Sequence, residues 1–236
     1  MSYPAVRVPA KKIHTASVIF LHGLGDSGHG WSFLSDEAAR SNKLQHVKFI
    51  FPHAPQQPVT LNMGMKMPSW YDIKELSSIQ AQQDEPGVLK SIDRLKQIIA
   101  EEVQAGIPTD RIIIGGFSQG CAVSLATSAV FDKPLAGVIG LSGYLPIKDT
   151  IISYSVDNKF DTVNKKTPHF LGHGTSDPVV QFQYGKLSRD TLINQLGREH
   201  VSWNEYPGME HSVCPEELDA ILKFAEKVLP EKTETA

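Results

Sequence analysis

Cysteine is scarce in this sequence, long hydrophobic runs are lacking, and basic residues do not cluster. Its two cysteines, Cys121 and Cys214, are too few for a disulfide framework, which indicates a reducing compartment. The apolar runs stop well short of the ~18 residues that a membrane-spanning helix needs. The formal net charge of -3 argues against nucleic acid or an anionic membrane surface as the main partner.

Targeting signals are also lacking near the start of the sequence. We find no pattern of charged, apolar and then small residues that would mark a signal peptide. Position 2 is Ser2, whereas N-myristoylation requires glycine there. We therefore expect a cytoplasmic protein with at most transient membrane contact, and the nucleus is left open as a second compartment.

Short apolar runs alternate with longer stretches whose apolar residues recur at helical spacing. The expected strands are Ser17 to Leu21, Val47 to Phe51, Arg111 to Gly115, Leu135 to Leu141, Pro168 to Leu171 and Val201 to Tyr206. The expected helices are Trp31 to Arg40, Gly87 to Ala105, Gln119 to Phe131, Gln181 to Leu196 and Glu216 to Leu229. This alternation predicts an α/β fold, with a mostly parallel sheet covered by helices on both faces.

The chain has no repeat, linker or break in composition that would divide it. We expect a single domain over residues 1–236, with a disordered tail at about 230–236. The expected helix 87–105 would share one apolar face made of Val88, Leu89, Ile92, Leu95, Ile98 and Ile99. Residues 52–76 and 144–167 follow neither period, and long irregular segments of this kind often carry function.

The segment GFSQG follows a strongly apolar run and precedes a helix rich in small residues. It fits the G-x-S-x-G pattern of a nucleophile elbow, in which Gly116 and Gly120 leave room for a sharp turn that presents Ser118. A serine at the start of a helix is also a common N-cap. The motif alone does not separate these two interpretations.

Two other expected strands are followed by polar side chains that suit a serine nucleophile. Asp177 lies in the loop HGTSDPVV, and His211 lies in the loop YPGMEHSV after the last expected strand. Alone, each is more typical of a turn or a solvated loop. Together, Ser118, Asp177 and His211 occur in the order of the catalytic triad of α/β-hydrolases, each after a separate strand.

These three residue types have complementary chemical roles. A serine hydroxyl is a poor nucleophile unless a base takes its proton, as His211 would, and Asp177 would fix the tautomer of that histidine. The negative charge that develops on the substrate also needs hydrogen-bond donors. The backbone N–H groups of Gln119 and of Leu24, in the glycine-rich segment HGLGD, are the expected oxyanion donors.

The glycine-rich segment has a second interpretation, since Gly23, Gly25 and Gly28 also fit the G-x-G-x-x-G turn that binds dinucleotides. That function needs an acidic residue roughly 20 residues further on, and the segment FIFPHAP has none. His169 and His173 are four residues apart, but their β-like context does not suit a metal site. We therefore expect no cofactor and no metal.

Motifs along most of the chain resemble one family. The segments VIFLHGLGDSGHGW, PHAP, MPSWYDI, GFSQG, GHGTSDPVV and YPGMEHSVCPEEL, between Ser17 and Leu229, are similar in sequence and order to those of acyl-protein thioesterases and their lysophospholipase and carboxylesterase relatives. The resemblance implies the α/β-hydrolase fold. It also places the triad on Ser118, Asp177 and His211 and the oxyanion amides on Leu24 and Gln119.

The resemblance further implies an acyl channel covered by the irregular segment after residue 60. Its expected wall consists of Leu61, Met63, Met65, Trp70, Ile73, Leu76, Val179 and Phe182. The implied activity is a serine hydrolase that removes S-palmitoyl groups from proteins through an acyl-enzyme. A lysophospholipase or carboxylesterase with the same triad, and a non-catalytic protein that binds lipids or proteins, remain as alternatives. A homodimer is left open.

Overall fold

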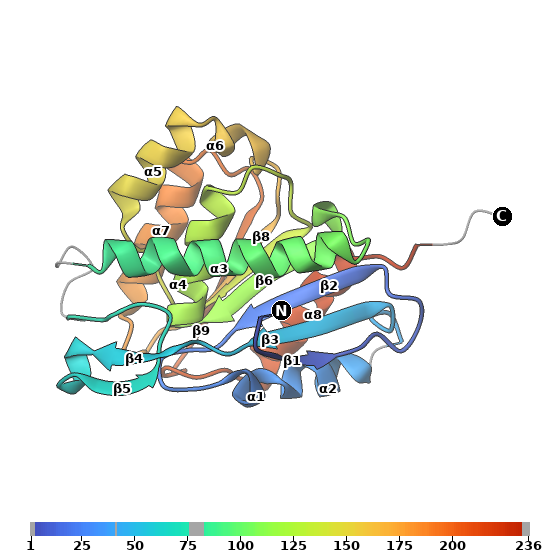
Figure 1. Ribbon diagram of the computed structural model, residues 1–236, viewed down its shortest axis with the longest axis horizontal. Coiled ribbons are helices and arrows are strands. Elements are labelled where there is room, and N and C mark those ends of the chain that lie inside the picture. The colour runs from blue at the N-terminus through green and yellow to red at the C-terminus, as the bar shows by residue number, and fades with distance from the viewer. Residues whose placement is uncertain (1–2, 41, 76–82, 233–236) are drawn as a thin grey trace.

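A seven-stranded sheet forms the centre of the computed structural model, which describes residues 3–40, 42–75 and 83–232 (Figure 1). In spatial order its strands are β1 (Ala5–Val8), β3 (Val47–Pro52), β2 (Ala16–Leu21), β6 (Ile112–Phe117), β7 (Gly137–Leu141), β8 (His169–Gly174) and β9 (Val201–Tyr206). Strand β1 pairs antiparallel with β3, and the other neighbours are parallel. The expected mostly parallel sheet is confirmed.

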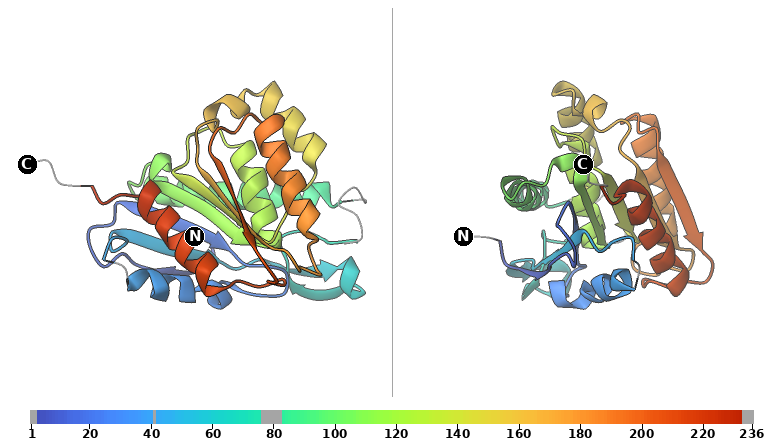
Figure 2. Two further views of the ribbon diagram at one scale, coloured as in Figure 1. Left: turned by 180° about the vertical axis from the view of Figure 1, so that it is seen from behind. Right: turned by 90° about the vertical axis from the view of Figure 1, so that its right-hand side faces the viewer.

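Helices cover both faces of this sheet, as the sequence predicts. They are α1 (Gly28–Trp31), α2 (Phe33–Ala39), α3 (Glu85–Gln104), α4 (Gln119–Ala129), α5 (Lys148–Asp157), α6 (Phe160–Val163), α7 (Phe182–Asn194) and α8 (Pro215–Val228). Helix α3 crosses in front of the sheet in Figure 1, and α8 lies in front of it when the molecule is seen from behind (Figure 2, left). Among the described residues, no helix is long and apolar enough to span a membrane.

Two apolar clusters form the core, one on each face of the sheet. Ile19 and Leu21 of β2 point to the cluster under α3 and α4, whereas Val18 and Phe20 point to the cluster under α1, α2 and α8. Successive side chains of a strand lie on opposite faces, so a strand buried on both sides is apolar throughout. This explains why β2 and β6 are recognisable as nearly continuous apolar runs.

Several elements differ from the expectation. The expected helix 31–40 is divided, because α1 ends at Trp31 and α2 begins at Phe33. Leu89 was expected on the buried face of α3 but is 40% exposed, and the buried face continues instead through Ser91 and Glu102. The sequence pattern also misses β1, α5, α6, the 3₁₀ turns η1 (Thr60–Asn62) and η2 (Thr109–Arg111), and a hairpin of β4 (Gln56–Val59) and β5 (Met65–Pro68).

The end of the described chain has no regular structure after α8. Residues 230–232, the first part of the expected disordered tail, are not helical, and Glu231 forms an ion pair with Lys12 Nζ at 2.7 Å. Residues 233–236 lie outside the described residues.

A buried carboxyl group lies in the first turn of α8. Glu217 is 0% exposed, and neither of its carboxylate oxygens has a hydrogen-bond partner among the described residues. A Cβ atom at Gly172 of β8 would lie 2.1 Å from Glu217 Oε1, so the carboxyl is pressed against the sheet. Burial raises the pKa of Glu217 to about 8.

This raised pKa predicts a stability effect that depends on pH. The native state keeps the proton on Glu217 while the unfolded chain loses it above the ordinary pKa of 4.5, so the penalty grows from about pH 5 to pH 8. We expect Glu217→Gln to gain stability relative to wild type over that interval, by up to about 1.4 kcal/mol per pH unit. Urea unfolding at pH 5, 7 and 8 measures this gain. The neighbouring exposed Glu216→Gln should show none, and equal gains for both variants would contradict the assignment.

Candidate active site

Ser118 lies on a sharp turn between β6 and α4. Its backbone has φ 54° and ψ -116°, a strained conformation for a residue other than glycine. A Cβ atom at Gly116 would lie 2.4 Å from the carbonyl carbon of Gly120, and one at Gly120 would lie 2.2 Å from the oxygen of Leu21. Both positions therefore require glycine, and the elbow geometry expected from GFSQG is present.

The N-cap interpretation of Ser118 does not hold. The residue occupies the position before the first residue of α4, but its side chain makes no capping hydrogen bond. Its Oγ lies instead 3.0 Å from Nε2 of His211, which is 93 residues further along the chain. The fold thus turns the hydroxyl away from its own helix and toward an imidazole.

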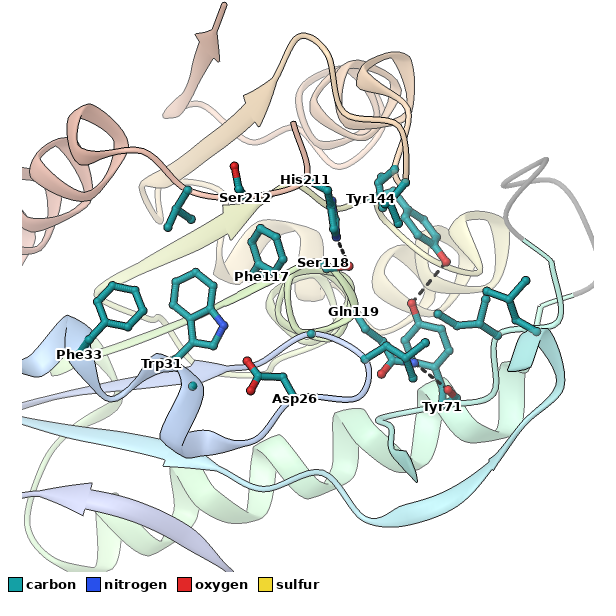
Figure 3. Close-up of a pocket in the computed structure, with 18 residues that line it drawn as sticks. Asp26, Trp31, Phe33, Tyr71, Phe117, Ser118, Gln119, Tyr144, His211 and Ser212 are labelled. Atoms are coloured by element: carbon teal, nitrogen blue, oxygen red, sulfur yellow. Dashed lines mark hydrogen bonds between the residues drawn. The ribbon is translucent and has the colours of Figure 1, made fainter. Parts of the chain in front are cut away.

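His211 connects Ser118 to Asp177. Its Nδ1 lies 2.7 Å from Asp177 Oδ2, so a proton on Nδ1 is donated to the carboxylate. Nε2 is then left free to accept from Ser118, a contact that Figure 3 shows. The imidazole is 16% exposed and packs against the ring of Phe117 at 4.7 Å between centroids. The structure therefore brings the three expected triad residues into one hydrogen-bonded chain.

The carboxylate of Asp177 is held from both sides. Its Oδ1 accepts hydrogen bonds from the backbone N–H groups of Val179 and Val180, each at 2.9 Å, and Oδ2 faces His211. Burial would raise the pKa of Asp177, but hydrogen bonds from His173 and His211 outweigh it and hold the pKa below its ordinary value. Asp177 is thus ionised near neutral pH and oriented toward the imidazole.

His173 supports the same carboxylate, a role that the sequence pattern did not indicate. Its Nε2 lies 2.8 Å from the carbonyl oxygen of Val180 and 3.4 Å from Asp177 Oδ2. His169, four residues earlier, has a separate contact, with Nδ1 2.8 Å from the oxygen of Thr167. The two histidines therefore have distinct structural contacts.

The two expected oxyanion residues flank Ser118. Gln119 is the first residue of α4, so its backbone N–H has no acceptor within the helix and lies at the positive end of the helix dipole. Leu24 lies in the turn after β2, where a Cβ atom on the preceding Gly23 would be 3.4 Å from Ser118 Cβ. Both residues line the cavity in front of the serine.

This cavity has a volume of about 570 Å³, within the range of roughly 300–1,000 Å³ that is common for ligand pockets. Its wall is mostly apolar and extends to both sides of Ser118 and His211 (Figure 3). Trp31, Phe33 and Phe117 lie on one side, and Tyr71 and Tyr144 lie on the other. The apolar wall also includes Leu61, Ile73, Val179, Val180 and Val213. An acyl chain and the group to which it is attached would thus have separate sides to occupy.

Three residues of the expected acyl wall lie at this cavity. Leu61, Ile73 and Val179 line the cavity. Met63 and Met65 do not, because the β4–β5 hairpin carries them outward, 96% and 61% exposed. Leu76 lies outside the described residues.

Two aromatic residues of the expected wall are also placed elsewhere. Trp70 is 1% exposed and does not line the cavity, and its indole N–H donates to the oxygen of His22. Phe182 turns to Trp203, with 5.6 Å between ring centroids, and to His173. Each of these two side chains therefore packs against other residues of the protein and does not face the cavity.

The sequence pattern missed the aromatic residues that form much of the wall. Trp31 and Phe117 lie within or beside expected elements, where apolar side chains are normally assigned to the core. Tyr71 and Tyr144 approach from distant segments, and their hydroxyl groups are 3.3 Å apart. Burial raises the pKa of both phenols, so they remain neutral. In the sequence, only the motif MPSWYDI, which contains Tyr71, indicated an aromatic part of this wall.

Neither cysteine is suited to replace Ser118 as the nucleophile. Cys121 is buried under the elbow, and burial raises the pKa of its thiol. Cys214 is partly exposed at the start of α8, and burial is again the largest cause of its raised pKa. Since the thiolate is the reactive form, neither thiol is activated as the Ser118 hydroxyl is, which has the imidazole of His211 3.0 Å away.

The fold and the hydrogen-bonded serine, histidine and aspartate define a hydrolase of the α/β-hydrolase class. Solved structures have the same fold: Arabidopsis thaliana SOBER1 superposes with a TM-score of 0.84 at 34% identity, covering 91% of this chain and 99% of that chain. Zea mays acyl-protein thioesterase 2 superposes with a TM-score of 0.80 at 29% identity, covering 97% of this chain and 100% of that chain.

Sequence comparison gives the family. The model of the phospholipase/carboxylesterase family matches residues 1–229, and the chain belongs to this family. Acyl-protein thioesterase 1 of Yarrowia lipolytica is 58% identical over 229 residues, covering 97% of this chain and 99% of the relative. Acyl-protein thioesterase 1 of Neurospora crassa is 46% identical, covering 96% of this chain and 92% of the relative.

Proposed function

We propose that this enzyme is an acyl-protein thioesterase that hydrolyses S-palmitoyl groups on proteins through an acyl-enzyme on Ser118. The observation that carries the proposal is the hydrogen-bonded chain from Ser118 through His211 to Asp177 at an apolar cavity of about 570 Å³. The names of the relatives in Yarrowia lipolytica and Neurospora crassa support the thioester substrate.

The proposed reaction begins with attack of Ser118 Oγ on the thioester carbonyl while its proton passes to His211 Nε2. The tetrahedral oxyanion receives hydrogen bonds from the amides of Leu24 and Gln119. Collapse breaks the C–S bond, and the cysteine sulfur leaves with the proton from His211. A water molecule then gives a proton to His211 and attacks the acyl-enzyme. Collapse breaks the ester bond, His211 returns the proton to Ser118 Oγ, and the fatty acid is released.

A substrate panel tests this assignment. Purified protein should hydrolyse a palmitoylated peptide with a higher kcat/KM than lysophosphatidylcholine or a short-chain ester. The alternative is a lysophospholipase or carboxylesterase, which the family description supports, and it predicts the opposite order. A folded sample that fails on an activated nitrophenyl ester would favour the third hypothesis, a binding protein without catalysis.

The cavity wall gives a prediction about chain length. Leu61→Ser and Val179→Ser should each lower kcat/KM for a palmitoylated peptide about tenfold, since each removes apolar contact with the chain at roughly 25 cal/mol per Å². Hydrolysis of an acetyl ester should change little. The control is Met63→Ser, because Met63 is 96% exposed and outside the wall. The wall assignment is wrong if the control loses as much palmitoyl activity as the two wall variants.

The proposal extends to organisation, partners and compartment. We propose one domain over residues 1–236, S-acylated proteins as partners, and the cytoplasm as the compartment, with transient membrane contact where acylated substrates reside. The seven-stranded sheet flanked by two apolar clusters supports a single domain. Cell fractionation tests the compartment, and sedimentation analysis tests whether the protein forms a homodimer.

A further inference from the structure

His22, directly after β2, lies in a buried hydrogen-bond chain next to Ser118. The residue is 0% exposed. The backbone N–H of Ala54 lies 3.0 Å from its Nε2, and the carbonyl oxygen of Gly23 lies 2.6 Å from its Nδ1. A backbone N–H can only donate, so Nε2 is an acceptor and Nδ1 carries the proton that is donated to Gly23. The neighbours of the ring thus select one tautomer.

The accepting carbonyl belongs to the peptide group that carries the Leu24 N–H. A trans peptide is planar, so the oxygen of Gly23 and the N–H of Leu24 point in opposite directions. The oxygen is bound by His22 Nδ1 and, at 3.3 Å, by the N–H of Asp26. While these bonds hold the oxygen on the buried side, the N–H of Leu24 is directed to the other side. Leu24 lines the same cavity as Ser118.

Trp70 joins His22 to the elbow. Its indole N–H donates to the oxygen of His22 at 2.9 Å, and the two rings are 5.3 Å apart. Its backbone N–H donates to Oε1 of Gln119 at 2.8 Å, and Nε2 of Gln119 donates to the oxygen of Tyr71 at 2.7 Å. Figure 3 shows Gln119 reaching from the start of α4 toward Tyr71. One chain of contacts therefore links the residues that carry both oxyanion amides.

We propose that His22 is a positioning residue of the oxyanion hole: its Nδ1–H holds the Gly23–Leu24 peptide with the Leu24 N–H facing the cavity, and Trp70 fixes His22 to the side chain of Gln119. This inference rests on the proposed acyl-transfer function. If His22 Nε2 were protonated, its N–H would face the backbone N–H of Ala54, and two donors would meet without an acceptor. Burial lowers the pKa of His22, near the side chains of Asp26 and His53, so the ring stays neutral.

A pair of substitutions separates the two ring nitrogens. In His22→Asn the amide nitrogen replaces Nδ1 and retains a donor to Gly23, whereas in His22→Gln the amide oxygen replaces Nε2 and retains only an acceptor for Ala54. We expect His22→Gln to lose about 10²-fold in kcat on a nitrophenyl ester with little change in KM, as for loss of one oxyanion donor. His22→Asn should lose at least tenfold less. A matched control is His46→Gln, a buried histidine that contacts Leu229 and should keep full kcat.

A second readout isolates the oxyanion. An acyl trifluoromethyl ketone adds to a serine and forms a tetrahedral oxyanion, whereas the corresponding secondary alcohol does not. His22→Gln should weaken binding of the ketone by the same factor as kcat and leave binding of the alcohol unchanged. Equal losses of kcat in the Asn and Gln variants, or unchanged binding of the ketone, would show that His22 has only a structural role and would overturn the proposal.

If both His22 variants fail to fold, the Trp70→Phe variant tests the proposal, because it removes the indole N–H together with the pyrrole ring and keeps a six-membered aromatic ring. We expect a loss of ketone affinity without a loss of alcohol affinity, and unchanged ketone affinity would overturn the proposal. Labelling of wild-type Ser118 by a fluorophosphonate is the independent check on the proposed function. If wild type is not labelled, that function fails first. If it is labelled and the variants behave alike, only the role of His22 fails.

Discussion

Replacement of Ser118 by alanine is expected to lower kcat for thioester hydrolysis by about 10⁶-fold, the scale seen when a serine nucleophile is removed. The hydroxyl of Ser118 lies 3.0 Å from His211 Nε2, and it is the group that would attack the substrate carbonyl. The measurement is hydrolysis of a palmitoylated peptide by wild type and variant. Labelling by a fluorophosphonate probe should disappear in parallel.

A second serine provides the control for this substitution. Ser142 follows β7, the strand next to β6, and also has a positive φ, of 45°. It is buried and does not line the cavity, so Ser142→Ala should keep most activity. Comparable losses of activity in the two variants would indicate that damage at the carboxyl ends of β6 and β7, rather than a missing nucleophile, explains the loss in Ser118→Ala.

Replacement of Asp177 by asparagine is expected to lower kcat by about 10⁴-fold with little loss of stability. The Oδ1 of asparagine can still accept from Val179 and Val180, so the loop is retained. The amide nitrogen then replaces Oδ2 and presents a donor to His211 Nδ1. The imidazole must move its proton to Nε2, where it can no longer accept from Ser118.

The check on this prediction is kcat together with the thermal midpoint of unfolding. A variant with an unchanged Tm and activity reduced by several orders of magnitude supports the tautomer argument. Asp219→Asn, on the exposed face of α8, is the control and should retain activity. Retention of more than a tenth of wild-type activity by Asp177→Asn would mean that His211 does not depend on this carboxylate.

The central strands could be predicted from the sequence because burial on both faces leaves a visible pattern. Strand β2, for example, is buried along its whole length and ends at Leu21, as expected. Strand β1 was missed because its four residues are only half-buried, and α5 was missed because its buried positions are only Ile151 and Ser155. Short elements at the edge of a fold carry too little apolar pattern to be distinguished from loops.

The sequence predicts the triad residues better than it predicts the residues around them. The order of Ser118, Asp177 and His211 after three strands reflects the parallel sheet, which brings the carboxyl ends of its strands to one edge. The cavity wall does not follow from such a rule. Met63 was expected to face the acyl chain because it is apolar, but the hairpin turns it to the surface. The His22 and Gln119 side chains contact residues that are distant in the sequence, so no short sequence motif could predict these contacts.

The most direct test of the account is the intact mass of the enzyme during turnover. Wild-type protein mixed with a palmitoylated peptide and quenched with acid should gain the mass of one palmitoyl group, and peptide mapping should place it on Ser118. The His211→Ala and Ser118→Ala variants, quenched after the same reaction time, should show no adduct. Hydrolysis without an adduct on Ser118, or with an adduct on Cys214, would contradict the proposed mechanism.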